Sequence, residues 1–262
     1  MDLRHQNKQG ASLSPAVWND IPYEQQRLFR HKGIFFFDDF LTAPTFASNT
    51  GQAPYITIQD TGVTIKGETT LPGGIMEIAG ADAANDDGGL QHGLNVTGLG
   101  FIDKTKPYDV AFEARWRTPS VADVSHFIGL GKPGRAVAGT LADSTGALVD
   151  KDLIGFHSLT AAPTTLKFVY RKEGQTAVDA VATALTFAAD TWYKLGFRYR
   201  AKNKRLTAYV DGEEVGYVNL ASATTFPSAV LMSPLWFLKA HTTAEKKALL
   251  DWWAFSMHNY DE

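Results

Sequence analysis

The two acidic residues that come nearest to a catalytic pair are Asp109 and Glu113. Hydrolysis of a glycosidic bond uses two carboxyl groups roughly 5 to 9.5 Å apart. Both residues lie in a segment with the two-residue period of a β-strand, where four residues separate their Cα atoms by about 13 Å. Arg115 and Arg117 share their face of that strand. We therefore expect a solvated ladder of charges here and no hydrolytic site.

Other patterns that could carry chemistry fail on their context. Residues 129–134 read GLGKPG and match the G-x-G-x-x-G of dinucleotide sites, but Pro133 leaves no helix whose N-terminus could hold a pyrophosphate. The seven histidines include no H-x-H or H-x-x-x-H pair, which argues against zinc. No G-x-S-x-G motif offers a serine nucleophile.

One loop contains residues that could bind calcium. Its oxygen-bearing side chains are Asp82, Asn85, Asp86 and Asp87. Their spacing is not that of an EF-hand, and a solvated turn is the stronger interpretation. We therefore expect no cofactor, with calcium at this loop as the alternative.

The elements that would position any site are strands. The clearest segment is 191–220, where apolar and polar residues alternate, as they do when one face of a strand is buried. Asp211 and Gly212 supply the positive φ angles of a tight hairpin turn. The pattern predicts a three-stranded antiparallel meander with Arg198 and Arg200 facing solvent or a partner. The residues predicted to face the core are Tyr193, Leu195, Phe197, Leu206, Ala208 and Val210.

Short alternating or continuously apolar runs recur along the rest of the chain. They lie at 33–40, 55–58, 63–66, 75–78, 90–96, 108–117, 127–130, 153–157, 166–170, 230–238 and 249–257. Residues 132–150 read as an excursion without a core of its own, and 239–248 as a connection with one or two helical turns. About eleven to thirteen strands and almost no helix predict an all-β fold with two packed antiparallel sheets of jelly-roll type.

Composition limits the function further. With 262 residues, of which 44% are hydrophobic, the chain can bury a large core, and we expect one main domain. A net charge of −3 gives no basic field for nucleic acid or an anionic membrane. The absence of cysteines and of an apolar N-terminal signal favours assembly in a reducing cytoplasm. No run approaches the roughly 20 apolar residues of a membrane helix.

Residues 1–33 differ from the sandwich predicted for 34–262. The first 32 residues carry five basic and three acidic side chains in an otherwise acidic protein, and 23–30 suggest a short helix after Pro22. The segment contains more apolar anchors than a disordered leader, the alternative interpretation, normally does. These are Trp18, Ile21, Tyr23, Leu28 and Phe29. We expect an arm whose anchors are buried against a partner or against the sandwich itself.

Several short motifs, taken in order, resemble one group of proteins. They are FFFDDF at 35–40, GGLQHG at 88–93, VAFEAR at 110–115, FIGL at 127–130, DLIGF at 152–156, WYKLGF at 192–197, AYVDG at 208–212 and LDWW at 250–253. In this order they resemble the concanavalin A-like, laminin-G-like structural proteins of tailed bacteriophage virions. The resemblance implies a virion component without enzymatic activity, assembled in the host cytoplasm and attached to the capsid or the tail.

Three hypotheses follow, and we rank them in this order. A capsid decoration or head-fibre protein, expected to be a homo-oligomer, would attach through its arm to the major capsid protein or another virion protein. A lectin-like module would bind a host-surface glycan, with Trp236 and His92 as contacts; Trp252 and Trp253 are adjacent, so at least one of them is core. A polysaccharide hydrolase comes last, because the Glu-x-Asp-x-Glu strand of related hydrolases is missing.

Overall fold

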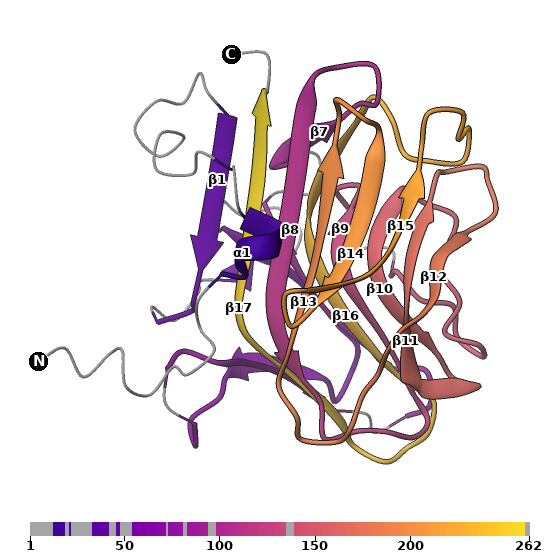
Figure 1. Ribbon diagram of the computed structural model, residues 1–262. Coiled ribbons are helices and arrows are strands. Elements are labelled where there is room, and N and C mark those ends of the chain that lie inside the picture. Colours follow the sequence, from indigo (N-terminus) through magenta and orange to yellow (C-terminus); the bar gives the residue numbers. More distant parts are fainter. Residues whose placement is uncertain are drawn as a thin grey trace, which may run out of the picture.

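The structure is a computed structural model of the chain. It describes residues 13–18, 21, 33–41, 46–47 (backbone only), 54–71, 73–80, 83–93, 98–134 and 139–259. These residues form two packed, almost entirely antiparallel β-sheets and one short helix, α1 (Pro15–Trp18). The all-β jelly-roll sandwich predicted from the sequence is confirmed (Figure 1).

The first sheet has eight strands. Along the sheet they run β15 (Glu213–Asn219), β14 (Arg205–Val210), β13 (Tyr193–Arg200), β8 (Tyr108–Arg117), β17 (Lys246–Asn259), β5 (Met76–Gly80) and β4 (Thr64–Gly67), and β1 (Gly33–Asp38) also pairs with β17. The last strand is the longest in the part of the chain described. It pairs with β8 along one side and with β5 and then β1 along the other.

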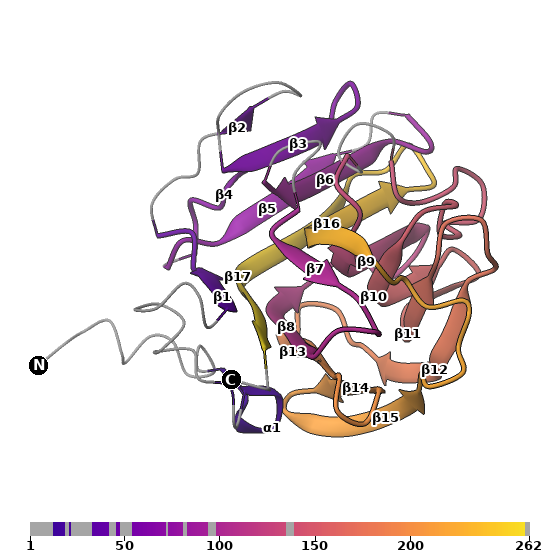
Figure 2. The same ribbon diagram turned by 90° about the horizontal axis from the view of Figure 1, so that it is seen from above.

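The second sheet has nine strands and packs against the first, as the view from above shows (Figure 2). Its order is β12 (Val178–Thr186), β11 (Ala162–Arg171), β10 (Leu153–Leu159), β9 (Val124–Gly131), β16 (Val230–Ala240), β6 (Asp87–His92), β3 (Tyr55–Gln59) and β2 (Phe46–Ala47), and β7 (Gly100–Ile102) also pairs with β16. Only β2 and β3 pair in parallel among these strands.

The predicted meander forms with the expected phase. Leu195 pairs with Val210 and Arg205 with Asn219. The predicted inward residues lie in the core between the sheets, and Tyr193 packs partly buried against it. Arg200 is exposed as predicted, but Arg198 is only 3% exposed. The alternation therefore predicts correctly which side chains point toward the core and which point away from it. The further assumption that the outward side chains are exposed to solvent fails at Arg198.

One predicted feature is absent in the structure, and two elements of the structure were not predicted. Residues 241–245 form bends, and no helical turn separates β16 from β17. Strand β12 was not predicted, because its alanines and exposed polar residues give no clear alternation. The short helix α1 was not predicted either, although Ser14 immediately precedes it and Pro15 occupies its first turn, a recognised start signal. The Ser14 carbonyl accepts hydrogen bonds from the amides of Val17 and Trp18. No helix within the described ranges is long and apolar enough to span a membrane.

Candidate functional site

The outer face of the nine-stranded sheet is covered by the connection between β9 and β10. Outward residues of the sheet form an apolar cluster of Phe127, Leu153, Val169, Leu235 and Phe237. Leu141 and Leu148 of the connection pack onto it and are 3% and 6% exposed. Residues 132–150, which we expected to form an excursion without a core of its own, thus contribute to an apolar cluster shared with the sheet beneath them.

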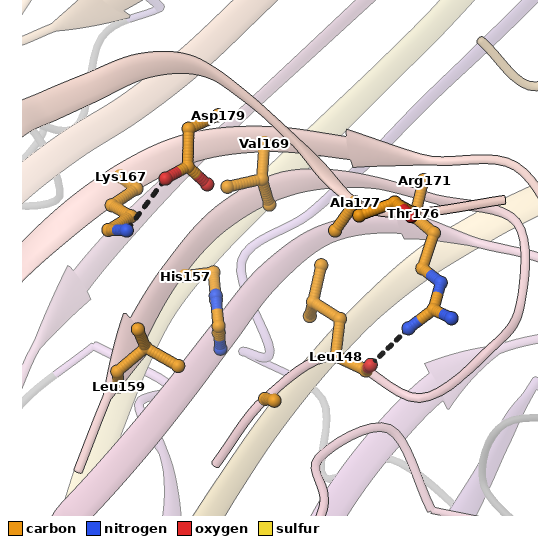
Figure 3. A pocket seen from close by; sticks show the side chains of 10 residues that line it. Leu148, His157, Leu159, Lys167, Val169, Arg171, Thr176, Ala177 and Asp179 are labelled. Carbon is orange, nitrogen blue, oxygen red and sulfur yellow. Dashed lines mark hydrogen bonds and ion pairs between the residues drawn. The ribbon is translucent and has the colours of Figure 1, made fainter. Parts of the chain in front are cut away.

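Beside this cover lies a cavity of about 290 Å³ (Figure 3). Strands β10, β11 and β12 form one side of it, and the connection forms the other. The lining residues are Ala147, Leu148, His157, Leu159, Lys167, Val169, Arg171, Thr176, Ala177 and Asp179. Thr176 and Asp179 are exposed, so the cavity is open to solvent along β12.

The charged side chains of the cavity are held by neighbours. Lys167 Nζ donates to Asp179 Oδ2 at 2.7 Å. Arg171 donates from Nη1 to the Leu148 carbonyl and from Nε to the Gln175 carbonyl, at 2.5 and 2.9 Å. These contacts fix the geometry of the cavity and leave it with two cations and one carboxylate.

His157 ties the cavity wall to the connection. Its Nε2 lies 2.6 Å from the Gly146 carbonyl oxygen, which can only accept, so Nε2–H donates a hydrogen bond to that oxygen. Burial lowers the pKa of His157 to about 4, which keeps the imidazole neutral at pH 7. Asp179 is the only carboxylate among the lining residues, and one carboxylate is not sufficient for the two-carboxylate hydrolysis of glycosides.

A buried ammonium fixes the other end of the connection. Lys239 Nζ lies 2.8 Å from Asp87 Oδ1, 2.9 Å from Asp143 Oδ1 and 3.0 Å from the Asn85 carbonyl. Burial alone would lower the pKa of Lys239, but the hydrogen bonds to the two carboxylates outweigh burial and raise it. Lys239 thus joins strand β16 to the loop before β6 and to the connection.

This ammonium occupies the place where calcium was considered. Asp87 and the carbonyl of Asn85 both serve Lys239, and Asp86 accepts a hydrogen bond from the Ala83 amide at 3.0 Å. Asp82 lies outside the described residues. Within the ranges that the structure describes, no group of three or more acidic or histidine side chains could hold a metal ion.

Comparison with solved structures identifies the fold. A protein of unknown function, SO2946 from Shewanella oneidensis MR-1, has a TM-score of 0.56 at 14% identity, covering 92% of this chain and 95% of its own. The β-glucanase of Bacillus licheniformis gives 0.52 at 14%, covering 84% and 97%. The lectin UEA-II, solved with galactose, gives 0.51 at 15%, covering 86% and 98%. The chain is a concanavalin A-like jelly roll.

At these identities the likeness shows the fold alone. Neither a protein-family model nor a curated protein matches the sequence. The concanavalin A-like fold predicted from the sequence is therefore confirmed. The placement on a bacteriophage virion stays a proposal.

The two acids of the charged ladder on β8 are buried, contrary to our expectation, and Arg115 and Arg117 are half-buried. Glu113 is 1% exposed and accepts hydrogen bonds from the Ser14 amide at 2.9 Å and from Trp18 Nε1 at 2.8 Å. Burial raises the pKa of Glu113, and these donors oppose the rise. Asp109 Oδ2 lies 3.5 Å from Arg198 Nη2 in an ion pair. The prediction failed because the N-terminal segment covers this face of the eight-stranded sheet (Figure 1).

Two of the five predicted arm anchors are buried against the chain's own sandwich. Trp18 and Ile21 pack with Val17 on Ala111, Tyr209 and Ala254. Their assignment as partner-binding residues is therefore wrong in this structure, and the alternative, burial against the sandwich, holds for them. Gly196 admits the segment, because a Cβ there would lie 3.0 Å from a Val17 methyl. Tyr23, Leu28 and Phe29 lie outside the described residues.

The predicted glycan contacts are not on the surface. Trp236 is 0% exposed within the core between the sheets, so its indole cannot stack on a sugar. His92 is half-buried between Phe36 and Tyr55, with ring centroids 4.0 and 5.4 Å away, and burial lowers its pKa to about 4. Trp252 and Trp253 are also 0% exposed, which removes the whole predicted tryptophan platform.

The cavity residues were missed for two reasons. Lys167 and Arg171 alternate with inward apolar residues on β11, so the period of two could have placed them together on the outer face. Leu148 and Thr176 sit in connections without a periodic pattern. Nothing in the sequence indicated that these connections meet the same three strands.

Proposed function

We propose that this jelly roll is a non-enzymatic carbohydrate-binding module whose cavity beside β10, β11 and β12 holds one sugar unit of a glycan. The observation that carries the proposal is the cavity itself. It combines an apolar side, formed by Leu148, Leu159 and Val169, with a hydroxyl, two cations and a carboxylate. Such a mixture of apolar wall and few polar groups is typical of small-ligand sites.

The size and rigidity of the cavity support this. Its volume lies near the lower end of ligand pockets, roughly 300 Å³. Lys167 and Arg171 are already oriented by hydrogen bonds, so binding would not have to order these long side chains. Polar groups held in place favour recognition of a ligand that is itself rich in hydroxyls.

The similarity to lectin UEA-II, solved with galactose, is consistent with this function at the level of the fold. The likeness to a β-glucanase makes hydrolysis the competing activity. The single carboxylate of the cavity argues against it, and so does the burial of Asp109 and Glu113.

A glycan array followed by calorimetry tests the proposal. Ala177→Phe fills the cavity and should abolish binding of any glycan found, and Thr176→Val, which removes one hydroxyl, should weaken it. Ala221→Phe, at an exposed alanine between β15 and β16, is the matched control and should bind normally. Glycan binding that survives Ala177→Phe would place the site elsewhere. Turnover of the bound glycan that is lost in Asp179→Asn would make the protein an enzyme.

A virion surface is the setting we propose for this module. The ordered sequence motifs that resemble those of bacteriophage virion proteins support it. The proposal implies contacts with a major capsid or other virion protein, and a homo-oligomer. Attachment would have to use a surface other than the side chains of Trp18 and Ile21, which are buried. Electron cryomicroscopy of virions from the source phage, compared with virions lacking this protein, should show density for the sandwich; identical maps would overturn the proposal.

A further inference from the structure

A half-buried tryptophan lies between cationic side chains on the outer face of the eight-stranded sheet. Of the six tryptophans in the chain, Trp192 alone is not buried. It precedes β13, and the register of β13 with β8 places it beside Arg117. The guanidinium carbons of Arg115 and Arg117 lie 4.5 and 5.0 Å from its ring centroid, within the range of cation–π contacts.

The two guanidiniums differ in their partners. Arg115 Nη1 lies 2.6 Å from Asp251 Oδ2 in a well-buried ion pair. Arg117 forms no ion pair within the ranges that the structure describes, and its Nε–H is buried without an acceptor. A buried donor left unpaired is unfavourable, and in a native protein it calls for an explanation such as a missing ion.

A second arginine on the same sheet shows the complete form of this arrangement. Arg205 stacks on Tyr217 at 3.8 Å, and its guanidinium also donates to Glu214 Oε1 at 2.5 Å and to Thr207 Oγ1 at 3.1 Å. Arg205 therefore has both an aromatic ring and an acidic partner. Arg117 has the ring and lacks the anion.

The surroundings of Arg117 favour an anion. Lys194 pairs in register with Arg115 on the neighbouring strand, so three cationic residues border Trp192. Two nearby acids are engaged: Asp251 with Arg115, and Glu77, across Leu249 from Arg117, with Lys66 at 3.6 Å. A guanidinium beside an indole can still present N–H groups in the fork that suits two oxygens of one oxyanion.

We propose that Arg117, assisted by Arg115 and Trp192, binds an oxyanion group of an external ligand, either a carboxylate or a sulfate. The oxyanion supplies the acceptor that Glu214 supplies to Arg205. This site lies on the opposite sheet from the cavity, and its existence does not depend on the proposed glycan binding.

Nuclear magnetic resonance of the full chain tests the site. The indole N–H of Trp192, assigned with Trp192→Phe, and the Nε–H of Arg117 are followed while sodium sulfate or sodium acetate replaces sodium chloride at constant ionic strength. We expect saturable shifts of both signals, with a dissociation constant on the order of 1 to 10 mM for such a small ion. Saturation by sulfate alone indicates a tetrahedral oxyanion, and saturation by acetate alone a carboxylate.

The variants separate a site from general charge effects. Arg117→Gln should weaken binding at least tenfold, whereas Arg205→Gln, which removes an equal charge from the paired arginine, should leave the affinity unchanged. Arg117→Lys keeps the charge and loses the fork, so it should bind several-fold more weakly, and it serves if the glutamine variant does not fold. Shifts that do not saturate with either anion, or equal affinity in all variants, overturn the proposal.

Discussion

Part of each outer face of the sandwich is covered by the chain itself, but by different means. On the nine-stranded sheet the cover is the connection between two adjacent strands, and it packs mainly through Leu141 and Leu148. On the eight-stranded sheet the cover is a segment remote in sequence, held by hydrogen bonds from Ser14 and Trp18 to the buried carboxylate of Glu113. The first cover joins two neighbouring strands of the sheet on which it lies, whereas the second bonds to a residue 95 to 99 positions away in sequence, and we expect it to detach more readily.

Each face also buries one cation. On the eight-stranded sheet, Arg198 is paired with Asp109. On the nine-stranded sheet, Lys239 is paired with Asp87 and with Asp143 of the connection between β9 and β10. Alternation along a strand therefore shows which side chains point outward. Whether the outward side is wet depends on what another part of the chain places over it.

Acid should produce the largest effect, and it should act through the nine-stranded sheet. Burial lowers the pKa of His126 to about 3 and those of His92 and His157 to about 4, and all three residues are on this sheet. The unfolded chain takes up these protons near pH 6.5. The stability that these histidines provide is thus complete above pH 6.5 and should fall by several kcal/mol toward pH 4.

Urea unfolding at pH 7, 5 and 4 measures this fall. Asp87 opposes it, because burial raises its pKa to about 6, so Asp87 favours the folded state as the pH falls below 6. His126→Phe keeps a ring against Trp116 and Phe187 and should flatten the pH dependence. An unchanged slope in this variant would show that His126 takes up its proton over the same pH range in the folded and the unfolded protein.

Removing either buried cation should be the next largest effect. Lys239→Met and Arg198→Met each remove the cationic partner of a buried carboxylate, which we expect to cost about 3 to 5 kcal/mol at pH 7.5 by urea unfolding. For Lys239→Met the loss should shrink below pH 6, because Asp87 becomes neutral. Adding Asp87→Asn or Asp109→Asn should restore part of the loss in the respective variant. A neutral Arg198→Met would mean that this face is open to water.

The two covers should respond differently to loss of an anchor. Trp18→Ala should cost about 3 kcal/mol. Further truncation, to a chain beginning at Lys32, should cost little more, because the loss cannot exceed the free energy with which the segment docks. For Leu148→Ala the loss of stability has no such upper limit, because the connection is joined to β9 and β10 at its two ends and cannot detach from the sheet. Progressive losses as Val17 and Ile21 are also changed to alanine would show that the N-terminal segment unfolds only with the sandwich.

The smallest effect is expected at an exposed pair. Arg205→Gln breaks the ion pair with Glu214, whose side chain is 43% exposed, and should change stability by less than about 1 kcal/mol. Thermal unfolding of Arg205→Gln and of Arg198→Met under the same conditions compares the two losses of stability directly. Equal losses in the two variants would remove the distinction between a covered and an open part of the same sheet.

The strands were predictable because their signal is local. The bounds predicted for β8 agree with the structure, and so does the phase of the meander around Phe197. The glycines of the G-x-G-x-x-G match also have a local explanation: Gly129 faces Gly155 on the next strand, and a Cβ on Gly129 would lie 2.2 Å from the Ile154 carbonyl oxygen. This glycine serves close strand packing in β9.

The candidate site was not predictable, because it depends on contacts between distant segments. Glu113 and Ser14 are 99 residues apart, and no spacing near either residue predicts their hydrogen bond. The cavity likewise needs Leu148, Thr176 and three strands to meet. The prediction of a glycan contact at Trp236 was wrong for a related reason. A large aromatic side chain suits both a sugar-binding surface and a protein core, and only the packing of the whole chain decides between them.

Strand β17 has a consequence for synthesis on the ribosome. It is the neighbour shared by β8, β5 and β1, and among the described strands neither β5 nor β1 pairs with β8. A nascent chain that has emerged only to residue 240 therefore exposes the edge of β8 and the half-built core behind it. Such an edge is a template for pairing with other chains. Nascent chains on one polysome would be at risk of aggregation until residues 246–259 insert, and chaperone demand should fall sharply at that length.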